Sequence, residues 1–141
     1  MFCGSNMKIN EKNEVVYSDD EELVAQFVEW TEEAITEMRQ LVDAMEGGQP
    51  RSSDTVVRVY DLTHNIKGMG GSFNFDLMTV VGTTLCTYLK NLDGDESVNK
   101  RILEAHVRTF EVILKSRIVG DGGAQGEALK QRLQTIITEN S

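Results

Sequence analysis

The sequence predicts an all-α protein, an antiparallel up-down-up-down four-helix bundle with an N-terminal arm and an extra C-terminal helix. Apolar residues recur at three- and four-residue steps through most of the chain, which is typical of helices that bury one face. Strand-like alternation is nearly absent, and glycine-rich or polar turns separate the helical blocks. Because short connections favour antiparallel neighbours, we expect one domain over residues 19–141, preceded by an arm over residues 1–18.

The first helix is expected over residues 19–46. A Ser/Asp cap region and acidic residues in the first turn favour its start. Gly47 and Gly48 end the helix, and the only proline of the chain, Pro50, follows them. The apolar stripe of this helix consists of Leu23, Phe27, Trp30, Ala34, Met38, Leu41 and Met45.

The second and third helices are expected over residues 53–72 and 75–92, with a turn near Phe73 and Asn74. Ser52 or Ser53 can cap the second helix, and Asn74 and Asp76 open the third. The two helices should therefore form an antiparallel hairpin. The third helix carries a core stripe of Leu77, Met78, Val81, Leu85, Tyr88, Leu89 and Leu92.

Two more helices are expected, over residues 97–118 and 124–138. The turn "DGDES" precedes the first of them, and "GDGGAQG" separates the two. The shorter C-terminal helix should pack on the side of the bundle. The apolar residues that support these helices are Ile102, Leu103, Phe110, Ile113 and Leu114, then Leu129, Leu133, Ile136 and Ile137.

Charge is distributed unevenly along the 141 residues. The net charge is −9, and residues 1–50 hold 12 acidic and 3 basic residues, whereas the remainder holds 11 of each. This balance argues against nucleic acid or an anionic membrane as partner, and a solvated acidic helix face is its simplest interpretation.

Targeting and cysteine patterns indicate a cytoplasmic protein. No apolar run approaches the roughly 18 residues needed to span a bilayer, and the N-terminus lacks a secretory pattern. Cys3 and Cys86 have no metal-ligand spacing, so we expect reduced thiols and no metal site.

The segment "LTHNIKGMGGSFNF", residues 62–75, contains one of the two histidines. On a helical wheel of about 100° per residue, His64 lies opposite the apolar face. This geometry predicts an exposed histidine rather than a core one, and an ordinary surface histidine remains an alternative. The apolar face consists of Val59, Leu62, Ile66, Met69 and Phe73.

Small residues surround this histidine. A glycine inside a helix costs about 1 kcal/mol relative to alanine, yet Gly68 and Gly71 lie on the outer face, where no core packing requires them. We infer that something must approach the backbone there. Close helix packing is an equally good explanation for the small residues of the third helix. The neighbours expected around His64 are Val57, Tyr60, Asp61, Lys67, Gly68 and Gly71, with Thr79, Gly82, Thr83 and Cys86 on the third helix.

An exposed histidine with a lysine three residues later suits phosphoryl transfer. A neutral imidazole is a nucleophile, and a lysine on the same face can neutralise the charge of the transferred group. Acyl transfer would need an oxyanion arrangement that is not readable here, and a metal site would need further ligands. His106 is interpreted as a structural residue on a helix face.

The pattern H-x-x-K-G followed by "GGSFNF" resembles the signature of histidine-containing phosphotransfer (HPt) domains, the four-helix-bundle proteins of two-component phosphorelays. The resemblance covers about residues 19–118, and its specific motif about 62–86. It implies that His64 is phosphorylated through Nε2, that Lys67 supports the phosphoryl group and that Gly68 gives the partner access. Many members have glycine where Asn74 stands, and a polar residue near Cys86 that hydrogen-bonds the imidazole.

The resemblance also implies partners and cofactors. The chain would be a monomeric phosphorelay intermediate without autokinase activity, exchanging phosphate with aspartates of response-regulator receiver domains and served by a hybrid histidine kinase. The receiver would supply the magnesium ion, and the chain would need no cofactor of its own. The expected docking residues are Val57, Tyr60, Asp61, Gly71, Gly82, Thr83 and Cys86.

Three alternatives compete with this interpretation. A phosphoacceptor fragment of a histidine kinase is disfavoured because no ATP-binding portion is recognisable. A module that binds receivers without transferring phosphate is disfavoured by the intact His64 and Lys67. A nucleotide enzyme is disfavoured because "GMGG" matches neither GxGxxG nor GxxxxGK[ST] and lies within a helix.

Overall fold

The computed structural model describes residues 8–9, 15–16 and 20–140, and the arm predicted over residues 1–18 lies mostly outside them. Five α-helices dominate this part of the chain, so the predicted all-α fold class is confirmed: α1 (Glu21–Asp43), α2 (Asp54–Gly70), α3 (Asp76–Lys90), α4 (Lys100–Lys115) and α5 (Gly123–Asn140). A 3₁₀ turn, η1 (Gly71–Phe73), follows α2 directly. The two antiparallel strand pairs are β1 (Lys8–Ile9) with β2 (Val15–Val16), and β3 (Gln49–Pro50) with β4 (Ser97–Val98).

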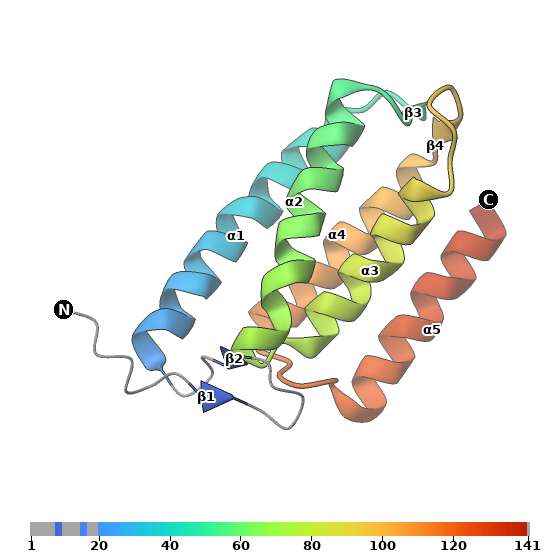
Figure 1. Ribbon diagram of the computed structural model, residues 1–141. Coiled ribbons are helices and arrows are strands. Elements are labelled where there is room, and N and C mark those ends of the chain that lie inside the picture. Colours follow the sequence, from blue (N-terminus) through green and yellow to red (C-terminus); the bar gives the residue numbers. More distant parts are fainter. Residues whose placement is uncertain (1–7, 10–14, 17–19, 141) are drawn as a thin grey trace.

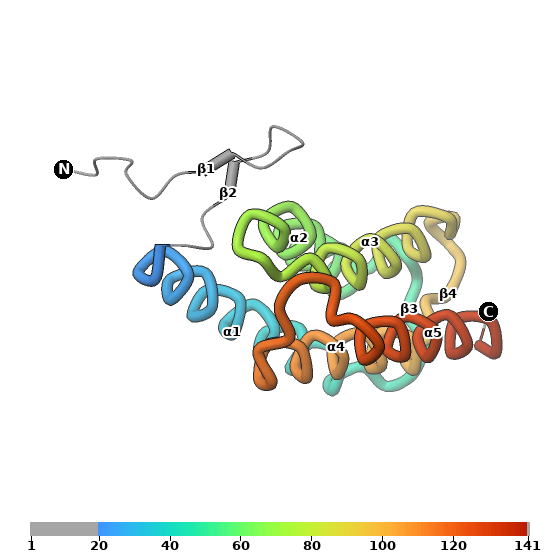
Figure 2. Tube along the Cα trace, turned by 90° about the horizontal axis from the view of Figure 1, so that it is seen from below, coloured from blue at the N-terminus to red at the C-terminus, as the bar shows by residue number. Residues whose placement is uncertain are grey.

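Successive helices run in opposite directions, as Figure 1 shows. The view from below in Figure 2 places α2 and α3 together on one side, with α4 and α5 on the other. The helix pairs that pack most extensively are α2 with α3, α1 with α4, and α4 with α5. This arrangement leaves the outer side of α2 facing solvent.

Side-chain caps define where three of the helices begin. The Asp20 carboxylate accepts a hydrogen bond from the Leu23 amide at 3.1 Å, and the Ser53 hydroxyl accepts one from the Val56 amide at 3.3 Å. Asn99 caps α4 through the Arg101 amide at 2.9 Å. The predicted starts of the first two helices are confirmed to within two residues, and Ser53 rather than Ser52 is the second cap.

The core follows the predicted stripes with exceptions: Leu23, Tyr88 and Leu92 are only partly buried, and α1 also shows a shift of phase. Trp30 and Leu41 are only partly buried, because the buried sector of α1 is broad and meets both α2 and α4. The ring of Phe27 stacks on that of Phe73, with centroids 4.5 Å apart, which connects the start of α1 to the end of α2. The buried residues of α1 are Phe27, Val28, Thr31, Ala34, Ile35, Met38 and Val42.

The turn between α2 and α3 depends on Asn74, which has φ 65° and ψ 26°. Asparagine tolerates this left-handed conformation better than most residues, as expected at this bend. Phe75 precedes α3 without a side-chain cap. The carbonyl of Gly120 caps α3 instead by accepting the Leu77 amide at 3.0 Å, while the Gly120 amide donates to the Asn74 carbonyl at 2.6 Å.

The last helix packs mainly on α4 and less on α3. Only Gly126 and Leu133 of α5 are buried, whereas Leu129, Ile136 and Ile137 are partly exposed. This matches a helix on the side of the core, as predicted. Among the described helices, none combines the length and the apolar character that a membrane span needs.

Candidate functional site

The two histidines occupy opposite environments. His64 is exposed on the outer side of α2, and the predicted opposite face is confirmed by the burial of Val59, Leu62, Ile66 and Phe73. Met69 is the exception, being 38% exposed, because it lies at the edge of that face near the end of α2. The prediction that His64 points away from the core is therefore confirmed.

His106 is fully buried in α4 and can act only as a structural residue. Its Nδ1 lies 2.8 Å from the carbonyl oxygen of Ile102, which can only accept, so Nδ1 donates and Nε2 is unprotonated. Nε2 has no hydrogen-bond partner among the described residues. Burial lowers the pKa of His106 from 6.5 to about 4. Of the two histidines, only His64 can meet another protein.

Lys67 lies at the contact between α2 and α3. A Cβ built on Gly82 would come within 2.9 Å of the Lys67 Cβ, so the absence of a side chain at Gly82 admits the lysine stem. The Thr79 hydroxyl donates to the Lys67 carbonyl at 2.9 Å and fixes the crossing further. No carboxylate within the described ranges pairs with the Lys67 ammonium, which is thus available to an anionic group.

Two of the predicted docking residues do not reach the surface. Gly82 is buried beneath Lys67, and Cys86 is only 1% exposed. Direct contact of either residue with a partner is therefore corrected to a packing role. Burial raises the pKa of the Cys86 thiol, and the nearby charge of Lys67 opposes that shift only partly.

The hydrogen bond that the resemblance implies for the imidazole is not provided by Cys86. Within the described part of the chain, no hydrogen bond joins His64 to another side chain. Its defined contact is aromatic: the rings of Tyr60 and His64 are nearly parallel, with 10° between their planes and 6.2 Å between their centroids.

The remaining predicted residues surround His64 on an open surface. Val57, Asp61 and Thr83 are exposed, and Tyr60 and Gly71 are partly exposed. A Cβ built on Gly68 would have no atom within 4 Å, so this glycine is not required by packing. Gly70 differs, because its Cβ would approach the Thr79 hydroxyl to 2.7 Å and the Phe75 carbonyl to 2.8 Å.

Arg51 is a neighbour of the site that the sequence did not reveal. Its guanidinium carbon lies 4.9 Å from the centre of the Tyr60 ring, and its Nε donates to the Leu89 carbonyl at 2.9 Å. Because Arg51 precedes α2, no helical wheel of α2 includes it. A cation near Tyr60 could be found only once the turn before the helix was placed in space.

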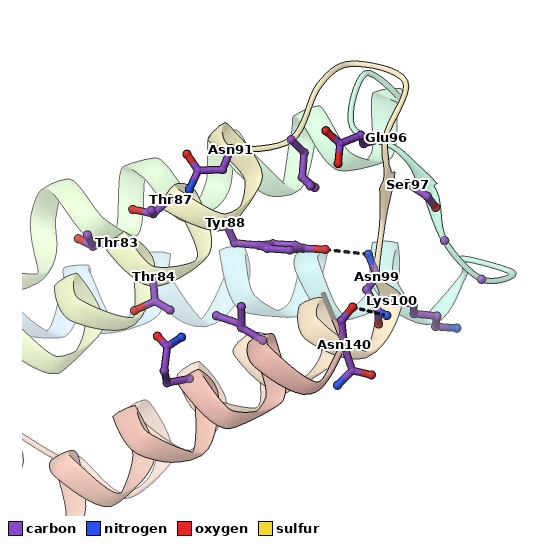
Figure 3. A pocket seen from close by; sticks show the side chains of 15 residues that line it. Thr83, Thr84, Thr87, Tyr88, Asn91, Glu96, Ser97, Asn99, Lys100 and Asn140 are labelled. Atoms are coloured by element: carbon purple, nitrogen blue, oxygen red, sulfur yellow. Dashed lines mark hydrogen bonds between the residues drawn. The ribbon is translucent and has the colours of Figure 1, made fainter.

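The site is a surface rather than a pocket. In the described part of the chain, the hollows between α3 and α5 and along α1 and α4 are lined by residues other than His64 and Lys67. A groove of about 1070 Å³ between α3 and α5 starts beside Thr83. Figure 3 shows its far end, where the Tyr88 hydroxyl accepts the Asn99 amide at 3.1 Å and the Asn99 side chain donates to the Asn140 carbonyl at 3.2 Å. A surface site of this kind suits a protein partner better than a small substrate.

The described residues contain no group of three or more His, Cys, Asp or Glu side chains arranged to hold a metal ion. The groups that the site itself offers are the His64 imidazole and the Lys67 ammonium, which pairs with no carboxylate among the described residues. The imidazole can form a bond to an electrophilic group, and the ammonium can balance negative charge on that group.

These features define a helical domain that presents one accessible histidine beside a lysine. Comparison with protein families agrees, since residues 22–138 match the family described as Hpt domain. The chain belongs to the Hpt domain family, and it is therefore a phosphotransfer module of two-component signalling. Comparison with curated proteins and with solved structures gives no match.

Proposed function

We propose that this protein is a phosphorelay intermediate that carries a phosphoryl group on His64 and exchanges it with aspartates of receiver domains. The observation that carries the proposal is that His64 is exposed whereas His106 is buried. On the same side of α2 lies the Lys67 ammonium, which pairs with no carboxylate within the described ranges. Hpt domains generally interact with receiver domains and histidine kinases. In this proposal α1–α4 act as an up-down-up-down bundle, α5 supports α4, and the protein works as a cytoplasmic monomer.

The proposed transfer begins with a neutral imidazole. Nε2 attacks the phosphorus of the receiver's aspartyl phosphate, an N–P bond forms, and the P–O bond to the aspartate breaks. The aspartate leaves as a carboxylate with the electron pair of that bond, while the proton on Nδ1 stays with the ring. The reverse step returns the phosphoryl group to an aspartate.

Lys67 and Gly68 have distinct proposed roles in this step. The Lys67 ammonium balances the negative charge of the phosphoryl oxygens, and its stem is held in place by the close approach to Gly82. Gly68 leaves room for the rim of the receiver pocket, where the aspartate lies. The receiver supplies the magnesium ion, and the docking surface comprises Val57, Tyr60, Asp61, Gly71 and Thr83.

The test is transfer of labelled phosphate from a phosphorylated receiver. We expect an acid-labile, base-stable label, as a phosphoramidate is, and expect His64→Gln to abolish it with unchanged helical circular dichroism. Asn65→Ala, on the exposed side of the same helix, is the matched control and should be labelled normally. Normal labelling of His64→Gln would overturn the proposal. Tight receiver binding by the wild type without any labelling would favour the module that binds without transfer.

A further inference from the structure

We propose that Tyr60, held in place by Arg51, is a positioning residue that fixes the ring orientation of His64. The inference rests on the proposed function, because orientation of an imidazole matters only if that imidazole reacts. It starts from the absence, among the described residues, of any hydrogen bond to the His64 ring. An exposed side chain without such a bond would sample several rotamers.

The Tyr60 ring supplies the missing restraint. Tyr60 precedes His64 by four residues in α2, so the two side chains lie on the same side of the helix one turn apart. Their planes differ by 10° and their centroids are 6.2 Å apart, within the range of offset-stacked aromatic pairs. A stacked arrangement restricts rotation of the imidazole without occupying either ring nitrogen, so Nε2 stays free to react.

Arg51 restrains Tyr60 in turn. Its guanidinium lies over the Tyr60 ring at 4.9 Å, a distance at which the cation is attracted to the aromatic face. The guanidinium is itself fixed, because Nε donates to the Leu89 carbonyl in the last turn of α3. The Arg51 amide also donates to the Glu96 carbonyl at 2.9 Å, next to the β3–β4 pair. Through Arg51, the Tyr60–His64 stack is therefore held to the end of the α2–α3 hairpin that lies opposite its turn.

The Tyr60 stack orients the His64 imidazole, a role for which Cys86 is unsuited. The thiol is buried, and its raised pKa keeps it protonated, so it offers only a weak hydrogen bond. A stack with an anchored aromatic ring restrains the same imidazole by contact instead. The positioning role predicts that Tyr60 affects the reaction step, whereas a mere docking residue would affect only receiver affinity.

The first measurement uses the unphosphorylated protein alone. Side-chain couplings and Tyr60–His64 ring contacts in nuclear magnetic resonance should show one His64 rotamer in the wild type and in Tyr60→Phe. Tyr60→Leu should show rotamer averaging, and Arg51→Met should show partial averaging. Val57→Ala, which truncates an exposed side chain of the same helix, is the matched control and should keep one rotamer. An unchanged His64 rotamer in Tyr60→Leu would overturn the proposal.

The second measurement separates positioning from docking. At saturating phosphorylated receiver, where a loss of affinity no longer limits the rate, Tyr60→Leu should still slow transfer by about three- to tenfold, the scale of a lost aromatic pair. Tyr60→Phe should restore the rate. A loss confined to affinity would make Tyr60 a docking residue and overturn the positioning role. If the wild-type rotamer is ordered but His64 is never labelled, the proposed function fails while the positional finding stands.

Discussion

Replacing Gly68 by glutamine should stabilise the protein and weaken its function at the same time. A Cβ at Gly68 meets no atom within 4 Å, and the residue lies inside α2 with a backbone that side chains adopt readily. Removing a glycine from a helix interior contributes about 0.5–1 kcal/mol. For a chain of this length that corresponds to a rise in melting temperature of roughly 2–4 °C.

Gly68→Gln should weaken receiver binding even though it stabilises the fold. Gly68 follows His64 by four residues, so a glutamine side chain there projects beside the imidazole that the receiver must reach. We expect receiver affinity to fall on the order of tenfold or more, because the added side chain obstructs the centre of the contact. Titration with receiver and thermal unfolding should be performed on the same Gly68→Gln sample.

Two control variants make the result interpretable. Gly68→Ala should give most of the stabilisation with a smaller loss of affinity, because it adds one methyl group. Gly70→Ala should destabilise by roughly 1–3 kcal/mol, since its Cβ would press on the Thr79 hydroxyl and the Phe75 carbonyl. A melting temperature of Gly68→Gln below that of the wild type would refute the packing argument. Unchanged receiver affinity would show that the docking surface lies elsewhere.

Three further predictions concern the lysine, the buried histidine and the helix contact. Lys67→Ala should slow transfer by about tenfold to a hundredfold with unchanged circular dichroism, because one charge-assisted contact contributes roughly 1.5–3 kcal/mol; equal transfer rates at several receiver concentrations would count against it. Because burial lowers the pKa of His106 to about 4, the unfolded chain binds its proton more tightly, and the free energy of unfolding should fall by about 2 kcal/mol between pH 7 and pH 5. Denaturation of His106→Leu should lack that part of the pH dependence, and an identical pH profile would contradict the assignment. Gly82→Ala should push Lys67 away, lowering stability by roughly 1–3 kcal/mol and slowing transfer, whereas Thr87→Ala, exposed further along α3 and outside the docking surface, should do neither.

Helix starts with a local side-chain cap, such as those of the first two helices, were predictable, but other boundaries were wrong. The first helix ends at Asp43 rather than at residue 46, and the helix predicted over residues 97–118 spans only Lys100–Lys115, because Ser97–Val98 pair with β3 as a strand. Ser53 and Asn74 act through their own backbone conformation and their nearest amides, which one short segment of sequence is enough to indicate. The outward direction of His64 was also predictable, since it needs only the helical repeat and the apolar neighbours on α2.

Features that depend on contacts between helices were not predictable from periodicity. The burial of Gly82 and Cys86 follows from how closely α3 approaches Lys67, and a single-helix wheel contains no such distance. Arg51 reaches Tyr60 through a turn outside any helix. The partial exposure of Trp30 and Met69 likewise reflects which neighbours α1 and α2 have, rather than their own sequence pattern.

The two hydrogen bonds of Gly120 determine where the chain can be shortened. A fragment ending after α4 would retain the phosphoacceptor helix but would lose the carbonyl that caps α3 and the amide that pairs with Asn74. The α2–α3 hairpin would then keep its residues and lose the support of its turn. A minimal fragment that preserves the His64 surface must therefore extend at least through Gly120, and the burial of Leu133 against the core favours keeping α5 as well.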